Sequence, residues 1–124
     1  MKIVIGSDKA GYSLKESVKN MLKEQGHTVV DVGTVDIEQP RPHTITGPAA
    51  AEMIQSGKAE KGILICGTGM GMAIAANKNK GVYAAVVESV YAAEYCRKIN
   101  DCMYGSIYCW RDDGKRYGKC FFDN

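Results

Sequence analysis

A cysteine followed by a glycine-rich turn lies in the middle of the chain, within the segment Gly62–Lys78. An apolar run leads into Cys66-Gly67-Thr68-Gly69-Met70-Gly71, and helix-forming residues follow. This order predicts a strand, a tight turn and a helix. Such a turn leaves backbone N–H groups free at the start of the helix, where they favour an anion, and a helix N-terminus also stabilises a thiolate. The segment therefore combines a nucleophile or a base with an anion hole.

The glycine-rich segments also resemble two nucleotide-binding motifs. The segment Gly6–Ser13 has nearly the letters of a phosphate loop, but Tyr12 stands where that loop needs a lysine, so nucleoside triphosphate binding is not expected. The glycines at 67–71 neither form G-x-G-x-x-G nor follow the first strand, so a dinucleotide-binding fold is not expected either. For Cys66 two interpretations stay open, a catalyst or an inert packing residue.

The composition is that of one globular domain. The chain has 124 residues, 45% of them hydrophobic and 24% charged, and we expect a single domain over 1–124. A net charge of +2 does not favour nucleic acid or an acidic membrane surface. No apolar run approaches the roughly 20 residues of a membrane span, so a cytoplasmic protein is expected. The five cysteines include no C-x-x-C pair and only two histidines are present, so neither a disulfide framework nor a metal site is predicted.

Hydrophobic patterning predicts alternating strands and helices. We expect strands at 2–6, 28–32, 62–66 and 81–87, each followed by a helix, at 13–25, from Pro48 to about 56, at 70–77 and at 90–99. This alternation predicts an α/β protein with a three-layer α/β/α Rossmann-like fold and a five-stranded parallel sheet in the order 2-1-3-4-5. The fifth strand would be 103–108, followed by a turn at 110–114 and a short helix at 115–124.

The predicted topology places a site between the first and third strands, where the strand order reverses. The loops after these strands begin at Ser7 and Cys66, so Asp8 and Lys9 are expected to face Cys66 and Thr68 across one crevice. The loop 33–48 contains three prolines, and its sixteen residues make it long enough to be functional.

The polar residues of these loops also have structural interpretations. Asp8 is suited to capping the first helix, and Lys9 and His43 are suited to a solvated surface. The pair Met70 and Met72 is expected to fill the core.

Three segments, in order, carry a resemblance to a known family. They are Gly6-Ser7-Asp8-x-Ala10-Gly11, Asp31-Val32-Gly33-Thr34, and Cys66-Gly67-Thr68-Gly69-x-Gly71 followed by Ala75-Ala76-Asn77-Lys78. Over about 1–102 the chain resembles the ribose-5-phosphate isomerase B family, which includes the two subunit types of galactose-6-phosphate isomerase. The resemblance implies an aldose–ketose isomerase of phosphorylated sugars that works through an enediolate and uses no metal or other cofactor.

The resemblance also implies roles for single residues. The cysteine matching Cys66 is the family's base, which moves a proton between C1 and C2, and the N–H groups from Gly67 to Gly71 suit the charge that develops on the former carbonyl oxygen. The aspartate matching Asp8 contacts sugar hydroxyls. The asparagine matching Asn100 reaches the site from a partner subunit, so the resemblance implies a homodimer or homotetramer with its site at the subunit interface.

The chain departs from the family in two single positions and in its tail. Members active on ribose phosphate carry a histidine in place of Lys9 and a second one, which helps to open the furanose ring, in place of Ile99. Either the substrate is a four-carbon sugar phosphate that cannot close a furanose ring, or His43, near a site tyrosine of the family, takes over. The tail from about 103 does not match the helix on which the family carries its phosphate-binding arginines.

The predicted function is that of an isomerase of a pentose, tetrose or hexose phosphate. The alternative is a non-catalytic member that acts as a partner subunit or as a phospho-sugar binding protein. The predicted catalytic residues are Cys66 and Thr68. The predicted substrate-binding residues are Asp8, Lys9, His43, Gly67, Gly69, Met70, Gly71 and Asn100, and no metal ligand is predicted.

Overall fold

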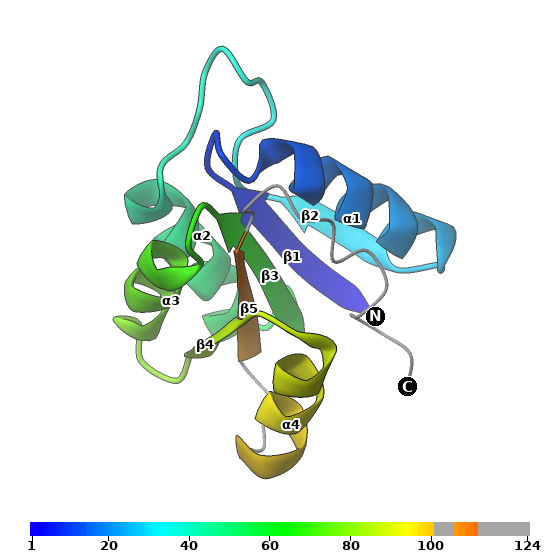
Figure 1. The fold of residues 1–124 in the computed structure, drawn as a ribbon, viewed down its shortest axis with the longest axis vertical. Helices are drawn as coiled ribbons and strands as arrows, with labels where there is room; N and C mark the ends of the chain where they lie inside the picture. The colour runs from blue at the N-terminus through cyan, green and yellow to red at the C-terminus, as the bar shows by residue number, and fades with distance from the viewer. Residues whose placement is uncertain (101–105, 112–124) are drawn as a thin grey trace.

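Strands and helices alternate along the chain in the computed structural model, which describes residues 1–100 and the backbone of 106–111 (Figure 1). The elements are β1 (Lys2–Ser7), α1 (Tyr12–Glu24), β2 (Thr28–Asp31), α2 (His43–Gln55), β3 (Lys61–Cys66), α3 (Met70–Asn77), β4 (Tyr83–Val87), α4 (Val90–Asn100) and β5 (Ser106–Arg111). The predicted α/β fold with a parallel sheet is confirmed. The predicted helix at 115–124 lies outside the described residues, and the single domain over 1–124 stays a prediction.

The described strands form one parallel sheet in the order β2-β1-β3-β5-β4. The order β2-β1-β3 agrees with the sequence prediction, but the predicted order of the last two strands is wrong, because β5 lies between β3 and β4. Helix α3 contacts all three of these strands, so the connection from β3 to β4 passes over the position that β5 fills. Hydrophobic runs predict where strands occur along the chain, and they do not encode which neighbour each strand takes.

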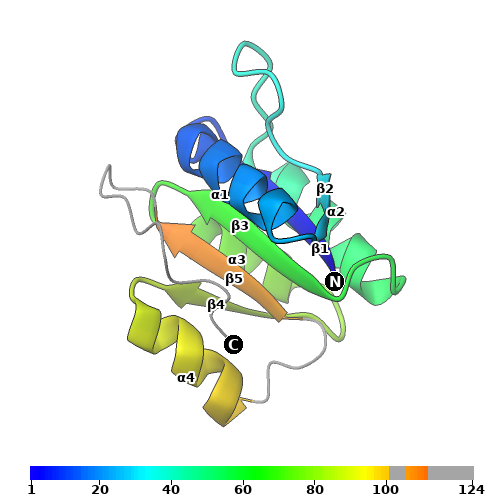
Figure 2. The same cartoon turned by 90° about the vertical axis from the view of Figure 1, so that its right-hand side faces the viewer.

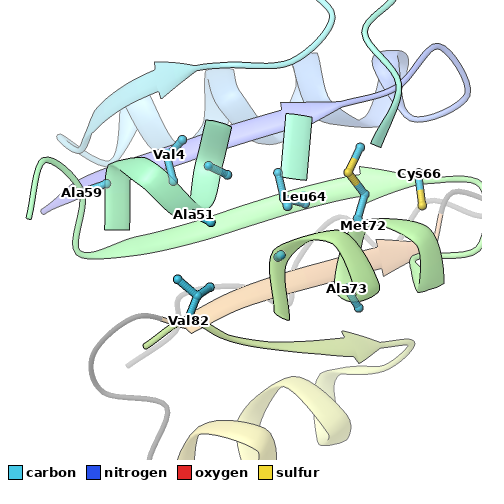
Figure 3. Close-up of a cluster of buried hydrophobic side chains, with 10 residues drawn as sticks. Val4, Ala51, Ala59, Leu64, Cys66, Met72, Ala73 and Val82 are labelled. Atoms are coloured by element: carbon cyan, nitrogen blue, oxygen red, sulfur yellow. The ribbon is translucent and has the colours of Figure 1, made fainter. Parts of the chain in front are cut away.

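Helices cover both faces of the sheet (Figure 2). Helices α2 and α3 pack on one face around Val4 and Leu64, and α1 and α4 pack on the other around Ile5 and Ile63. Because side chains alternate along a strand, Cys66 belongs to the same face as Leu64, toward α3 (Figure 3).

Of the two methionines that were expected to fill the core, only Met72 does so. Met72 is fully buried in the cluster of Figure 3, whereas Met70 is 57% exposed. Two positions on a helix that are two residues apart point about 200° apart, so both cannot face the sheet. The prediction was therefore wrong for Met70.

Helix α2 begins at His43, before the start that was predicted at Pro48. The N–H groups of Ile45 and Thr46 donate to the carbonyl of Pro42, at 3.0 and 2.9 Å, and open the helix there. The early turns are held by packing, since a Cβ on Gly47 would lie 2.5 Å from the Cβ of Ala75 in α3. This contact outweighs the helix-start signal of Pro48, which lies inside the helix. His43 is consequently part of the first turn of α2 rather than of the loop.

Candidate active site

The loops that follow β1 and β3 lie against each other at the carboxyl edge of the sheet. The N–H of Asp8 donates to the carbonyl of Ile65 at 3.3 Å, and a Cβ on Gly11 would lie only 2.5 Å from that same oxygen. On the other side of the contact, a Cβ on Gly67 would lie 3.9 Å from the Cβ of Ala10. The close approach of Gly11 therefore needs a residue without a side chain. The backbone brings together the two loops that the topology had placed side by side.

Cys66 is the last residue of β3 and is 5% exposed. Its Sγ accepts a hydrogen bond from the N–H of Gly69 at 3.1 Å. Gly69 has φ +78°, in the left-handed region, and precedes the first turn of α3. An N–H donor at the start of a helix stabilises negative charge on the atom that it contacts. The sulfur thus lies beside the glycine turn with a backbone N–H donor directed at it.

Thr68 lies exposed on the same turn, and its hydroxyl oxygen accepts a hydrogen bond from the N–H of Met70 at 3.2 Å. A hydroxyl that accepts in this way keeps its own proton for another acceptor. Thr68 can therefore donate to an oxygen of a bound molecule. The N–H groups of Gly69 and Met70, which were predicted to bind substrate, are already engaged within the turn.

A groove of about 490 Å³ opens beside these loops. Its lining includes Asp8, Lys9, Arg41 and His43. One carboxylate oxygen of Asp8 accepts from the N–H of Gly11, at 2.9 Å, but Gly11 is the residue before α1 and no side chain caps the helix, so the expected capping by Asp8 is not found. The carboxylate also lines the groove, so its contact with Gly11 and a binding role are compatible.

The ring of His43 lies between this groove and the glycine turn. A Cβ on Gly71 would lie 3.1 Å from Cγ and from Nδ1 of His43, so the absence of a side chain at Gly71 makes room for the ring. His43 also lines a second groove, of about 270 Å³, between α2 and α3. The structure therefore brings His43 to the first turn of α3, near the predicted anion hole.

Asn100 does not join these residues within one chain. It ends α4, and this helix leads from the carboxyl end of β4 back to the amino end of β5, which is parallel to β4. Asn100 is therefore near the edge of the sheet opposite to Cys66. A role for Asn100 in the site of a partner subunit stays a prediction.

Arg41 lines the groove but is not among the residues predicted from the sequence. The N–H of Arg41 donates to Oγ1 of Thr34 at 2.9 Å, and its carbonyl accepts from Oγ1 of Thr46 at 3.3 Å. Both threonines are fully buried. The available signal was a cation between Pro40 and Pro42, inside the long loop that had been singled out as functional.

The described part of the chain contains neither a cluster of metal-ligating side chains nor a membrane-spanning helix. No three His, Cys, Asp or Glu side chains in 1–100 gather closely enough to hold a metal ion. None of the helices α1–α4 is long and apolar enough to cross a membrane.

Comparison with known proteins gives the class to which this fold and site belong. The family model described as "Ribose/Galactose Isomerase" matches residues 3–107. A 4-deoxy-4-sulfo-D-erythrose isomerase of Clostridium sp. (strain MSTE9) is 61% identical over 110 residues, which are 89% of this chain and 69% of that protein. A ribose-5-P isomerase B of Listeria innocua is 44% identical over 101 residues, 82% of this chain and 68% of that protein.

A solved structure agrees with these relatives. The ribose-5-phosphate isomerase B of Clostridium thermocellum superposes with a TM-score of 0.79 at 43% identity, over 86% of this chain and 70% of that one. The chain therefore belongs to the ribose/galactose isomerase family, a class of sugar isomerases.

Proposed function

We propose that the protein interconverts the aldose and ketose forms of a four-carbon sugar that carries a sulfonate or a phosphate on C4. The observation that carries the reaction is the position of Cys66, whose sulfur accepts the N–H of Gly69 beside the loop of Asp8. A base held in a preformed site next to N–H donors suits proton abstraction next to a carbonyl.

The reaction follows from this geometry. The Cys66 thiolate takes the proton from the hydroxyl-bearing carbon next to the carbonyl, and the carbonyl oxygen of the resulting enediolate takes up negative charge. Free N–H groups of the turn and the hydroxyl of Thr68 stabilise this charge. The thiol then returns the proton to the neighbouring carbon while a hydroxyl proton passes between O1 and O2, so the product is an isomer and Cys66 is regenerated. Asp8 orients the sugar hydroxyls.

The four-carbon chain length is supported by Ile99. Family members active on ribose phosphate carry at this position the histidine that helps to open the furanose ring. An isoleucine side chain can neither donate nor accept a proton. A four-carbon aldose closes a furanose ring only through its C4 hydroxyl. A sulfonate on C4 replaces this hydroxyl and a phosphate esterifies it, so neither sugar can close the ring. Such a sugar stays open and needs no ring-opening acid. The name of the 61% identical relative, a 4-deoxy-4-sulfo-D-erythrose isomerase, supports the same chain length.

The active form is proposed to be an oligomer of this chain, with Asn100 of one subunit reaching the Cys66 of another. An exposed apolar stripe on α4 supports this proposal. Tyr91, Tyr95 and Ile99 repeat at intervals of four residues and are 70%, 36% and 73% exposed. Apolar side chains in such a row favour contact with another protein surface.

The test is isomerisation in D2O, followed by NMR. Wild-type protein is expected to interconvert 4-deoxy-4-sulfo-erythrulose or erythrulose 4-phosphate, with deuterium entering at C1 or C2, and to act poorly on ribulose 5-phosphate. The Cys66→Ala variant should lose about 10²- to 10⁴-fold in kcat, because it lacks the base. Cys96→Ala, which changes a half-buried cysteine on the opposite face, is the matched control and should stay active.

Three outcomes would contradict parts of the proposal. Equal rates on four- and five-carbon substrates would remove the chain-length assignment. If ribulose 5-phosphate is a good substrate and His43→Ala abolishes only that activity, His43 is the ring-opening residue instead. If no sugar phosphate or sulfonate reacts and Cys66→Ala behaves like wild type, the protein is a non-catalytic binding protein or partner subunit.

A further inference from the structure

The groove beside the catalytic loops contains two cations, Lys9 and Arg41, that the proton transfer does not use. We propose that Arg41, assisted by Lys9, binds the terminal oxyanion of the substrate, a sulfonate or a phosphate. This inference rests on the proposed function and names the residues that select its substrate class. It makes Arg41 a substrate-binding residue of a loop at the carboxyl edge of the sheet.

The backbone of Arg41 is held in place on both sides. Its N–H and its carbonyl are bound by the hydroxyls of two fully buried threonines, Thr34 and Thr46, at 2.9 and 3.3 Å. Pro40 and Pro42 flank it and restrict the backbone further, since a residue before proline is confined to extended conformations. A backbone fixed in this way does not have to be ordered when a ligand binds, so only the side chain of Arg41 loses conformational freedom.

The side chain of Arg41 keeps most of its donors available. Within the described residues, neither Lys9 nor Arg41 forms an ion pair, and Nη1 of Arg41 has only a long contact of 3.4 Å with the carbonyl of Val32. A guanidinium has five N–H donors in a planar fork that matches two oxygens of a sulfonate or a phosphate. Most donors of the guanidinium are therefore available to an oxyanion.

The groove that Lys9 and Arg41 line adjoins the turn that contains Cys66. Asp8 and His43 line it as well, and both adjoin the turn that contains Cys66, through the contacts of Asp8 with Ile65 and of His43 with Gly71. A short substrate can thus have its carbonyl end at the turn and its anionic end at Arg41.

The charges of the groove lining bear on which oxyanion fits better. Lys9 and Arg41 are positive and Asp8 is negative, so these three groups together carry about one positive charge. A sulfonate carries a single negative charge, whereas a phosphate monoester has a second pKa of about 6 and carries more than one near neutral pH. We therefore expect repulsion from Asp8 to weaken the binding of the sulfonate less than the binding of the phosphate.

The experiment compares Arg41→Met, Arg41→Lys and Lys9→Met with wild type on three substrates: the sulfonated tetrulose, the tetrulose phosphate and unsubstituted erythrulose. Arg41→Met should raise KM for the two anionic substrates about 10- to 100-fold while kcat changes little, and Arg41→Lys should recover only part of the loss. Lys9→Met should raise the same KM values by less. The loss on erythrulose, which carries no oxyanion, should be clearly smaller than the loss on the two anionic substrates. Lys80→Met, which removes an exposed lysine between α3 and β4, is the matched control.

Two results would overturn the assignment. One is an unchanged KM for the anionic substrates in Arg41→Met. The other is an equal loss on unsubstituted erythrulose, which would mean that Arg41 acts through the fold rather than on the oxyanion.

A binding measurement separates this inference from the proposed reaction. Ethanesulfonate and ethyl phosphate are titrated into Cys66→Ala and into Cys66→Ala/Arg41→Met, with NMR shifts as the readout. Binding that weakens at least about tenfold without Arg41 supports the oxyanion site even if wild type isomerises no sugar. If Cys66→Ala binds neither anion, or binds them equally well without Arg41, the site is wrong even if the isomerase is active.

Discussion

At the scale of single residues, the candidate site depends on one backbone conformation. Gly69 has φ +78°, and this conformation aims its N–H at the sulfur of Cys66. Residues with a Cβ adopt the left-handed region at a cost of roughly 1–2 kcal/mol. The hydrogen bond to the sulfur is therefore sensitive to any side chain at this position.

A pair of glycine variants tests this point. Gly69→Ala and Gly81→Ala place the same strain in two glycines of similar φ, +78° and +77°, and a Cβ on Gly81 meets nothing within 4 Å. Both should lower the free energy of unfolding by about 1–2 kcal/mol in urea melts. Only Gly69→Ala should also lose kcat, by at least about tenfold, because the donor to Cys66 moves. Equal activity of the two variants would show that this hydrogen bond is not used.

The residues at the centre of the candidate site were predictable, and those at its margin were not. Asp8 and Cys66 follow strands whose apolar runs are unmistakable, so the topology alone brings their loops together. Arg41 lies in a loop without periodicity, and its position depends on the long-range contacts with Thr34 and Thr46. No local pattern encodes such contacts.

At the scale of elements, helix α1 is tied to the end of β2 by a buried ion-pair network. The ammonium of Lys15, which is fully buried, donates to Asp31 at 2.7 Å and to Glu16, and Lys19 contacts the same two carboxylates at 3.1 and 2.8 Å. The other oxygen of Asp31 accepts the N–H of Gly33 at 3.0 Å. The network therefore fixes the start of the loop that carries Arg41.

The network predicts a loss of stability in acid. Burial raises the pKa of Glu16, but the hydrogen bonds and charges of Lys15 and Lys19 outweigh it and bring the pKa below 4.5. A carboxylate whose pKa is lowered by folding stabilises the protein above its unfolded pKa, and this contribution disappears as the pH falls through the folded pKa.

Glu16→Gln should therefore lower Tm by about 1–4 °C at pH 7, and the difference from wild type should shrink at pH values well below 4.5. Glu94→Gln, which removes the exposed partner of Lys98 on α4, is the control and should change Tm little at either pH. Thermal melts across this pH range provide the measurement. A difference for Glu16→Gln that stays constant with pH would mean that its carboxylate contributes nothing through its charge.

Most elements were predictable, and the errors have physical causes. Helix α3 has the predicted bounds, and α4 begins at the predicted residue, where the hydroxyl of Ser89 accepts the N–H of Ala92 at 3.0 Å. The start of α2 was missed because a tertiary contact, Gly47 against Ala75, extends the helix past its proline signal. The position of β5 was missed because strand order is a property of the whole sheet.

At the scale of the whole molecule, the proposal that the site is shared between subunits leads to a complementation test. Cys66→Ala and Asn100→Ala should each be nearly inactive alone. If Asn100 acts in the partner's site, a mixed dimer contains one site with both residues intact. Random mixing of the two variants by unfolding and refolding should then restore up to about a quarter of wild-type activity.

Activity that stays at the level of the separate variants would show that Asn100 acts within its own chain or not at all. Gel filtration of the mixture must show the same oligomer as wild type. The control is a mixture of Cys66→Ala with Lys80→Met, in which activity should fall only in proportion to the share of chains that lack the Cys66 thiol.

The position of β5 has a consequence for how the protein is made on the ribosome. Strand β4 pairs only with β5 among the described strands, so the sheet has a vacant central slot until the last of these strands is synthesised. Until then the edge of β3 presents unpaired N–H and C=O groups, which attract strands of other chains. The nascent chain can assemble β2, β1 and β3 early, but it joins β4 to them only at the end. Helix α3 covers one face of the vacant slot during this interval and so shields part of the exposed edge of a half-finished sheet.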